Sequence, residues 1–273
     1  MSENWRLIIT PPLTGATNMA LDEVLLHSAA IKQEPPTLRL YSWQVPTLSL
    51  GYSQSSKEVN ILLLEQFGWG LVRRPTGGRA ILHTDELTYS ITAPMDDPLV
   101  SGNLLESYQR ISKALLYALQ NLGVSARADS EYSNQVTSNR KEPVCFEVPS
   151  NYEVTVNGKK LIGSAQARKN NGVLQHGSLP LFGDLTRITQ VLNYEGEEKR
   201  KKSADSLLGH AGTVLSLTGK TISLEEAQKA FINAFSSTLD IQFSMCEPDQ
   251  REWALVSELE KNKYNSPDWT QRL

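Results

Sequence analysis

The stretch that decides the fold runs over residues 151–179 and reads NYEVTVNGKKLIGSAQARKNNGVLQHGSL. Three strand-like runs in it are separated by the turn signals NG at 157–158 and NNG at 170–172. Asn-Gly between such runs is the strongest short-range signal for a β-hairpin, because both residues tolerate the positive φ angles of a tight turn. The stretch therefore predicts consecutive antiparallel strands joined by two hairpins.

The segments before this stretch also favour strands. TLRLYSW at 37–43 and TLSLGYSQ at 47–54 alternate with period two on either side of Pro46, which predicts two paired strands. GLVRRPTGGRAILH at 70–83 predicts a strand, a glycine turn and a second strand, and ELTYSITAP at 86–94 continues the sheet.

Helices are expected at fewer places, namely 17–31, a short one at 59–68, 103–123, 223–239 and 247–264. We expect Thr17 or Asn18 to cap the first of them. The basic run EKRKK at 198–202 is typical of a solvated loop, although it could also dock an acidic partner.

Together these elements predict an α+β fold of mixed, mostly antiparallel sheet with helices packed on it. The simplest organisation is a single domain over residues 1–273, with its core at about 30–245. The C-terminal helices at 224–264 either pack on this core or form a small appendage.

Composition narrows the class of protein. The chain has 273 residues, 40% hydrophobic and 21% charged, with a net charge of −3, which argues against a general affinity for nucleic acid or an anionic membrane. Cys145 and Cys246 form neither a disulfide framework nor a CxxC metal pattern. No secretory signal is expected, and no apolar run approaches the roughly 20 residues that span a bilayer. The expected location is the cytoplasm.

Three groups of residues could carry chemistry. In the first, RRPTGGRAILH at 73–83, two glycines allow close approach of a ligand and the arginines offer planar donors for phosphate or carboxylate. The plainer interpretation is a tight hairpin with surface arginines.

The second group, GKKLIGSAQAR at 158–168, places Lys159 and Lys160 on opposite faces of a strand, so at most one faces a pocket. The small residues at 163–165 leave a groove for an apolar acyl chain or a flat ring.

The third is Cys145, which follows a segment from 127 to 143 with almost no aliphatic side chains. A nucleophilic cysteine needs a nearby cation, a helix N-terminus or a base, and Lys160 could supply the cation. A structural cysteine is the alternative. Of the histidines, His176 lies on a strand where it could line a pocket, and His83 lies just past the glycine turn. The histidine spacing matches no metal motif, so no metal site is expected.

Six segments taken together resemble the biotin/lipoate protein ligase superfamily, and within it the cysteine-dependent octanoyltransferases of the LipM type. In chain order they are NMALDEVLL, TLSLGYSQ, RRPTGGRAILHTDELTYS, VCFEVPSNYEV, GKKLIGSAQAR and LQHGSL. The resemblance covers most of the chain.

The resemblance implies transfer of an octanoyl group from octanoyl-acyl carrier protein to a lysine of a lipoyl-carrier protein, typically the glycine cleavage H protein. It implies that Cys145 forms an acyl-thioester and that Lys160 lowers the pKa of this thiol and could later act as a base. The residues that would bind the substrate are Arg73, Arg74, Thr76, Gly77, Gly78, Arg79, His83, Gly163, Ser164, Ala165, Gln166, His176 and Gly177. ATP is not needed, because conversion of a thioester to an amide is downhill, and no metal is expected. A monomer is expected.

Several alternatives stay open. An ATP-dependent lipoate–protein ligase on the same fold typically reads GGGAVxHD where this chain reads GGRAILHT, with Arg79 and Thr84. A related amidotransferase moves octanoate from the H protein to other lipoyl domains. A non-catalytic acyl-binding module would be expected to lack the cysteine or the lysine. A nucleic-acid-binding regulator would need an added winged-helix segment.

Overall fold

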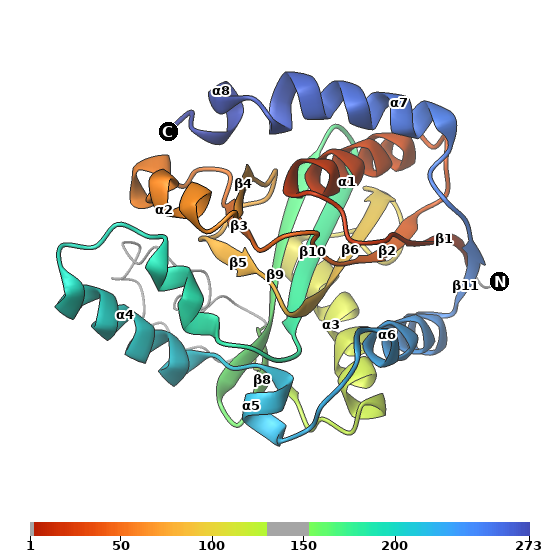
Figure 1. Ribbon diagram of the computed structural model, residues 1–273. Coiled ribbons are helices and arrows are strands. Elements are labelled where there is room, and N and C mark those ends of the chain that lie inside the picture. Colours follow the sequence, from red (N-terminus) through yellow and green to blue (C-terminus); the bar gives the residue numbers. More distant parts are fainter. Residues whose placement is uncertain (1–2, 130–152) are drawn as a thin grey trace.

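The computed structural model describes residues 3–129 and 153–273 and confirms a mixed α/β fold built on a large, mostly antiparallel sheet (Figure 1). The strands are β1 (Glu3–Ile9), β2 (Thr37–Tyr41), β3 (Thr47–Leu50), β4 (Gly70–Arg73), β5 (Ile81–His83), β6 (Glu86–Pro94), β7 (Arg127–Asp129), β8 (Glu153–Val156), β9 (Lys159–Lys169), β10 (Gly172–Pro180) and β11 (Ile241–Met245). The helices are α1 (Gly15–Ala30), α2 (Ile61–Gln66), α3 (Leu104–Asn121), α4 (Glu197–His210), α5 (Val214–Thr218), α6 (Leu224–Leu239), α7 (Gln250–Leu259) and α8 (Pro267–Thr270). Short turns of other helix types span Ser56–Glu58, Leu185–Gln190 and Glu260–Tyr264.

Within the described residues the strands form two sheets. The large one has eight strands in the order β11-β1-β2-β6-β10-β9-β8-β7, and the small one has three in the order β4-β3-β5. Strand β1 runs parallel to both of its neighbours, whereas the other pairs of the large sheet are antiparallel. The predicted pairing of 37–43 with 47–54 is wrong, because β2 belongs to the large sheet and β3 to the small one. The segment 70–83 is likewise no hairpin, since β3 lies between β4 and β5.

The two hairpins of the deciding stretch are confirmed. Asn157 and Gly158 have φ angles of 52° and 75° between β8 and β9, and Asn170 and Asn171 have φ angles of 51° and 62° between β9 and β10. Positive φ at both central residues defines the type of hairpin turn whose twist matches that of the flanking strands. These turns fix the register that places Ala165 opposite His176 and Gly163 opposite Ser178.

The large sheet has one apolar face and one polar face. Leu38, Tyr89 and Ile91 belong to the main core, together with Phe231 and Phe235 of α6. Helices α3 and α6 cover this face, and α1 lies on the opposite side with α7 beyond it (Figure 1). Because successive strand residues alternate between faces, the intervening side chains point toward α1 and the small sheet. Those side chains are polar and buried: Arg39, Thr88, Ser90, His176 and Ser178.

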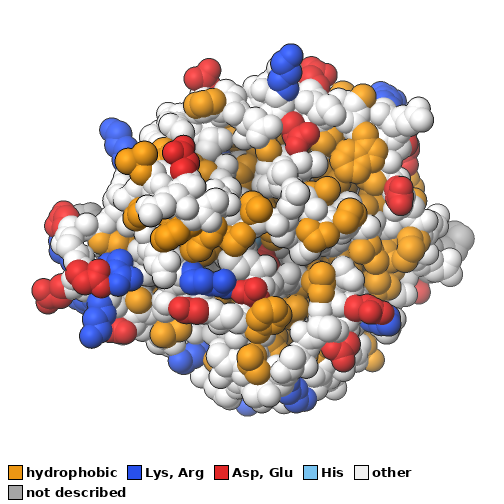
Figure 2. Space-filling model, in the orientation of Figure 1, with side chains coloured by type: hydrophobic (Ala, Val, Ile, Leu, Met, Phe, Trp, Pro, Cys, Tyr) orange, Lys and Arg blue, Asp and Glu red, His pale blue; other side chains and the backbone are white. Residues whose placement is uncertain are grey.

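The predicted cap of the first helix and the predicted loop at 198–202 are both corrected. Helix α1 begins at Gly15, and its cap is Thr14, whose hydroxyl accepts a hydrogen bond from the Thr17 backbone, so the predicted caps lie inside the first turn. The run 198–202 is the exposed first half of α4 rather than a loop, and Leu207 anchors this helix in a second core beside the small sheet. Acidic and basic side chains are intermixed where α4 lies, at the left edge of Figure 2, and the ion pairs Lys199–Glu195 and Arg200–Glu197 belong to this region.

Candidate active site

A narrow cavity lies between the polar face of the large sheet and the small sheet. Seven of the residues predicted to bind substrate line it: Arg74, His83, Gly163, Ser164, Ala165, His176 and Gly177. Seven further lining residues were not predicted: Met19, Tyr41, Trp43, Ser49, Ile81, Thr88 and Ser178. The cavity volume is about 20 Å3, which is room for about one water molecule, so a longer ligand enters only if lining side chains move.

His83 occupies one wall of this cavity in a fixed orientation. Its Nδ1 lies 2.7 Å from Glu86 Oε1 and its Nε2 lies 2.8 Å from Ser49 Oγ. The ring stacks on Trp43 with a centroid separation of 4.0 Å and an interplanar angle of 11°. Burial alone would raise the pKa of Glu86, but the adjacent His83 ring and the hydroxyls of Thr88 and Ser178 lower it, so this residue is a carboxylate.

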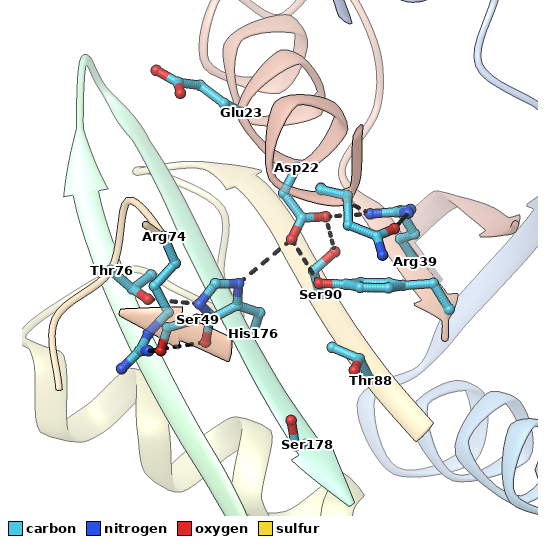
Figure 3. A network of polar contacts seen from close by, with 12 residues as sticks. Asp22, Glu23, Arg39, Ser49, Arg74, Thr76, Thr88, Ser90, His176 and Ser178 are labelled. Atoms are coloured by element: carbon cyan, nitrogen blue, oxygen red, sulfur yellow. Dashed lines mark hydrogen bonds and ion pairs between the residues drawn. The ribbon is translucent and has the colours of Figure 1, made fainter. Parts of the chain in front are cut away.

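His176 occupies a second wall and links the glycine loop to the buried carboxylate of Asp22 (Figure 3). Thr76 Oγ1 lies 2.6 Å from His176 Nε2, and Asp22 Oδ2 lies 3.5 Å from Nδ1. Burial lowers the pKa of His176 and outweighs the opposing effect of Asp22. The imidazole is therefore neutral at pH 7, with Nδ1–H facing the carboxylate and Nε2 accepting from the threonine hydroxyl.

Arg74 shapes the glycine loop from within. Its guanidinium donates to the carbonyl of Ser49 at 3.0 Å and to those of Gly77 and Arg79 at 2.8 and 2.7 Å. Gly78 has a φ of 94°, which favours glycine at this position. Of the predicted loop residues, Thr76, Gly77, Gly78 and Arg79 do not line the cavity. Arg79 instead faces Glu58, with 3.5 Å between Nη1 and Oε1.

The small residues of β9 let the strands approach closely. Ser164 Oγ lies 2.8 Å from the hydroxyl of Tyr89, and a Cβ atom added to Gly177 would lie 2.6 Å from a ring carbon of that tyrosine. Gly177 is therefore required by packing as well as lining the cavity. Gln166 bonds to Ser107 of α3 at 2.6 Å, and it does not line the cavity.

Arg73, the first residue of the predicted loop, does not line the cavity either. It is fully buried, and its guanidinium donates to main-chain carbonyls of the loop at 51–54 and of the C-terminal segment. In this structure Arg73 joins two segments of chain.

Lys160 and Cys145 are the predicted catalytic pair. Lys160 is buried, with 3% of its surface exposed, on β9 three residues before Gly163, and it is not among the residues that line the cavity. Its carbonyl accepts a hydrogen bond from the backbone of Gly212 at 3.2 Å. Cys145 lies outside the described residues, so its placement beside Lys160 stays a prediction.

Residues 3–129 and 153–273 contain no group of three or more histidine, cysteine or acidic side chains suited to hold a metal ion. Over the same ranges, no helix is both long and apolar enough to cross a membrane.

The fold agrees with the comparisons to known proteins. Residues 14–236 match the family described as the lipoyl protein ligase A/B catalytic domain. The chain belongs to this family, and it is an acyltransferase.

The particular relatives are octanoyltransferases. The chain is 41% identical over 271 residues to octanoyltransferase LipM of Carboxydothermus hydrogenoformans and 37% identical over 274 residues to that of Bacillus subtilis, with 99% of each chain covered. Among solved structures it resembles a bipartite lipoate protein ligase of Thermoplasma acidophilum, with a TM-score of 0.82 and 25% identity over 98% of this chain and 96% of that one. It also resembles lipoate-protein ligase A bound with ATP, with a TM-score of 0.78, 25% identity and 99% coverage of both chains.

Proposed function

We propose that this protein transfers an octanoyl group from octanoyl-acyl carrier protein, through a thioester on Cys145, to a lysine of a lipoyl-carrier protein of the glycine cleavage H protein type. The observation that carries this proposal is the similarity to octanoyltransferases LipM over 99% of the chain. The cavity supports it because the small residues Gly163 and Ala165 form its β9 wall, where an acyl chain could lie once other lining side chains move.

The main alternative is an ATP-dependent ligase, since a solved ligase with bound ATP shares the fold. Arg79 stands where such ligases typically carry a third glycine, and its side chain faces Glu58. This difference favours the transferase. The two activities differ in what they require, because a thioester donor already carries the activation that ATP supplies to a free acid.

The test is intact-mass spectrometry of the protein after incubation with octanoyl-acyl carrier protein in the absence of ATP. We expect a single octanoyl adduct that maps to Cys145, is removed by neutral hydroxylamine, and is absent from Cys145→Ser. Cys246→Ser is the matched control and should be acylated as the wild type is, because Cys246 directly follows the edge strand β11 and lies near Arg6 of β1 rather than at the cavity. Modification of the H protein that requires ATP, or that survives loss of Cys145, contradicts the proposal.

Lys160→Ala tests the proposed role of the lysine in activating the thiol. An ammonium beside a thiolate favours the charged form, so its removal should move the pH dependence of Cys145 alkylation by iodoacetamide to higher pH. Lys159→Ala is the matched control, because Lys159 Nζ donates to the carbonyl of Leu208 on α4. An unchanged alkylation profile in Lys160→Ala would show that another group activates the cysteine.

A further inference from the structure

Ser49, His83 and Glu86 form a continuous hydrogen-bonded row at the cavity, which we call the relay. The distances are 2.8 Å from Ser49 Oγ to His83 Nε2 and 2.7 Å from His83 Nδ1 to Glu86 Oε1. Ser49 and His83 line the cavity, and all three residues are buried. A hydroxyl, an imidazole and a carboxylate in this order form the arrangement by which a histidine takes up a proton from a hydroxyl group.

The neighbours of the relay suit transfer of a proton from Ser49 to His83. Arg74 Nη1, which can only donate, lies 3.1 Å from Ser49 Oγ, so the serine oxygen accepts there and its own hydrogen is available to His83 Nε2. Glu86 Oε1 also accepts from Thr88 at 2.6 Å and from Ser178 at 2.8 Å. A carboxylate with these donors takes the hydrogen of His83 Nδ1. In the tautomer that carries its hydrogen on Nδ1, His83 can accept a proton at Nε2.

The relay lies toward the Lys160 end of the cavity. Ser178 Oγ is 3.3 Å from His83 Nδ1, and Ser178 pairs across the sheet with Gly163. Gly163 follows Lys160 by three residues on the same strand, whereas the other histidine pairs with Ala165, further from Lys160. The proposed function puts the acyl carbonyl near Lys160 and Cys145, and the relay is therefore the buried histidine site closer to the reacting carbon.

We propose that the relay is the proton acceptor when the lysine of the lipoyl-carrier protein attacks the acyl-thioester, an inference that rests on the proposed function. The neutral amine forms the N–C bond to the acyl carbon. One of its hydrogens passes to Ser49 Oγ as the serine hydrogen passes to His83 Nε2. The C–S bond then breaks, and the imidazolium returns its proton to the thiolate of Cys145. Glu86 is a positioning residue that holds the accepting tautomer of His83. Lys160 keeps the separate task of activating the thiol.

The simpler explanation is that the relay only satisfies polar groups buried between the two sheets. The two explanations differ in one measurable respect. A proton acceptor matters for an alkylamine, whose attack leaves a proton that must be removed, and it matters far less for hydroxylamine, which is a strong nucleophile and neutral at pH 7. A structural role would affect both reactions alike.

The experiment starts from the octanoyl-Cys145 form, prepared with octanoyl-acyl carrier protein and freed of the donor. Its decay is followed by quenched-flow mass spectrometry with either a purified lipoyl-carrier protein or hydroxylamine as the acceptor. We expect His83→Gln to slow transfer to the lysine by about 100-fold, the scale of general-base catalysis, and to leave the hydroxylamine reaction unchanged. Ser49→Ala should likewise slow transfer to the lysine and leave the hydroxylamine reaction unchanged. Glu86→Gln should have the same effect but more weakly.

His210→Gln is the matched control, because this exposed histidine at the end of α4 lies outside the cavity, and it should behave as the wild type does. Equal slowing of both acceptors, or transfer to the lysine at the wild-type rate in His83→Gln or Ser49→Ala, overturns the relay. Failure to form octanoyl-Cys145 in the wild-type protein would instead contradict the proposed function, so the two failures are distinguishable.

Discussion

Replacement of Arg39 by methionine should lower the free energy of unfolding by about 3–5 kcal/mol, because it leaves a buried carboxylate without its counter-ion. Arg39 and Asp22 are both fully buried, and Arg39 Nη1 lies 2.8 Å from Asp22 Oδ1. The guanidinium also donates to the side chain of Asn18 and lies over the ring of Tyr41, 3.9 Å from its centroid. The measurement is unfolding in urea. If the dependence of the unfolding free energy on urea concentration has the same slope in both proteins, a shift of the midpoint concentration reports the change in stability.

Two controls separate the ion pair from other effects. Arg251→Met makes the same change on the exposed surface of α7 and should be close to neutral. The double variant with Asp22→Asn and Arg39→Met should lose less than the sum of the single losses, since the asparagine removes the unbalanced charge. Strict additivity of the two substitutions would contradict the coupling.

The same ion pair predicts a pH dependence. Burial alone would raise the pKa of Asp22, but the hydrogen bond from His176, the charge of Arg39 and the hydroxyl of Ser90 hold it below its usual value. A carboxyl whose folded pKa is lowered stabilises the protein fully above its unfolded pKa, about 3.9, and loses this contribution as the pH falls through the folded value. The stability gap between wild type and Arg39→Met should therefore narrow as acidification protonates Asp22, first in the variant, where burial raises its pKa without the opposing charge, and at lower pH in the wild type.

The parts of the fold that could be predicted from the sequence are those that local residues determine. Asn157-Gly158 and Asn170-Asn171 favour the positive φ angles of a tight hairpin turn, so both hairpins and the order β8-β9-β10 could be predicted from the local sequence. The pattern of 47–54 shows that it forms a strand, but its partners are strands from 70–73 and 81–83, and period two carries no information on partners. Helix α4 was missed because only Ser203 and Leu207 are buried along it, too few for a periodic apolar stripe.

The candidate site, like the fold, could be predicted from the sequence only in part. Motifs identified His83, His176 and the small residues at 163–165, which do line the cavity. Ser49, Thr88 and Ser178 were missed, although one signal for them exists. Polar residues at every second position of otherwise apolar strands, as at Thr88 and Ser90, mark a buried polar face. The contact between Asp22 and Arg39 joins a helix to a strand of another segment and has no local signature.

Replacement of Arg73 by lysine should detach the C-terminal segment and lower the free energy of unfolding by about 3 kcal/mol, since buried carbonyls are left without donors. Arg73 donates to the carbonyls of Gly51 and Gln54 at 2.8 and 2.6 Å and to that of Thr270 at 2.9 Å. Trp269 returns a hydrogen bond from its indole to the Arg73 carbonyl at 2.9 Å. An ammonium group has three donors on one atom and cannot span both segments as the planar guanidinium does.

The readout that distinguishes this role from substrate binding is amide hydrogen exchange. Loss of protection should concentrate in residues 264–273 and in the loop at 51–56, where Ser56 bonds to the terminal Leu273 at 2.8 Å. Arg251→Lys, an exposed arginine in α7, is the matched control and should leave the exchange pattern unchanged. If Arg73→Lys kept wild-type protection and stability but raised the KM for the acyl donor, Arg73 would contact substrate, as its place in the RRPTGG motif predicted. The bonds of its guanidinium to the chain favour the structural outcome, in which transfer falls because the loop that carries Arg74 loses its support.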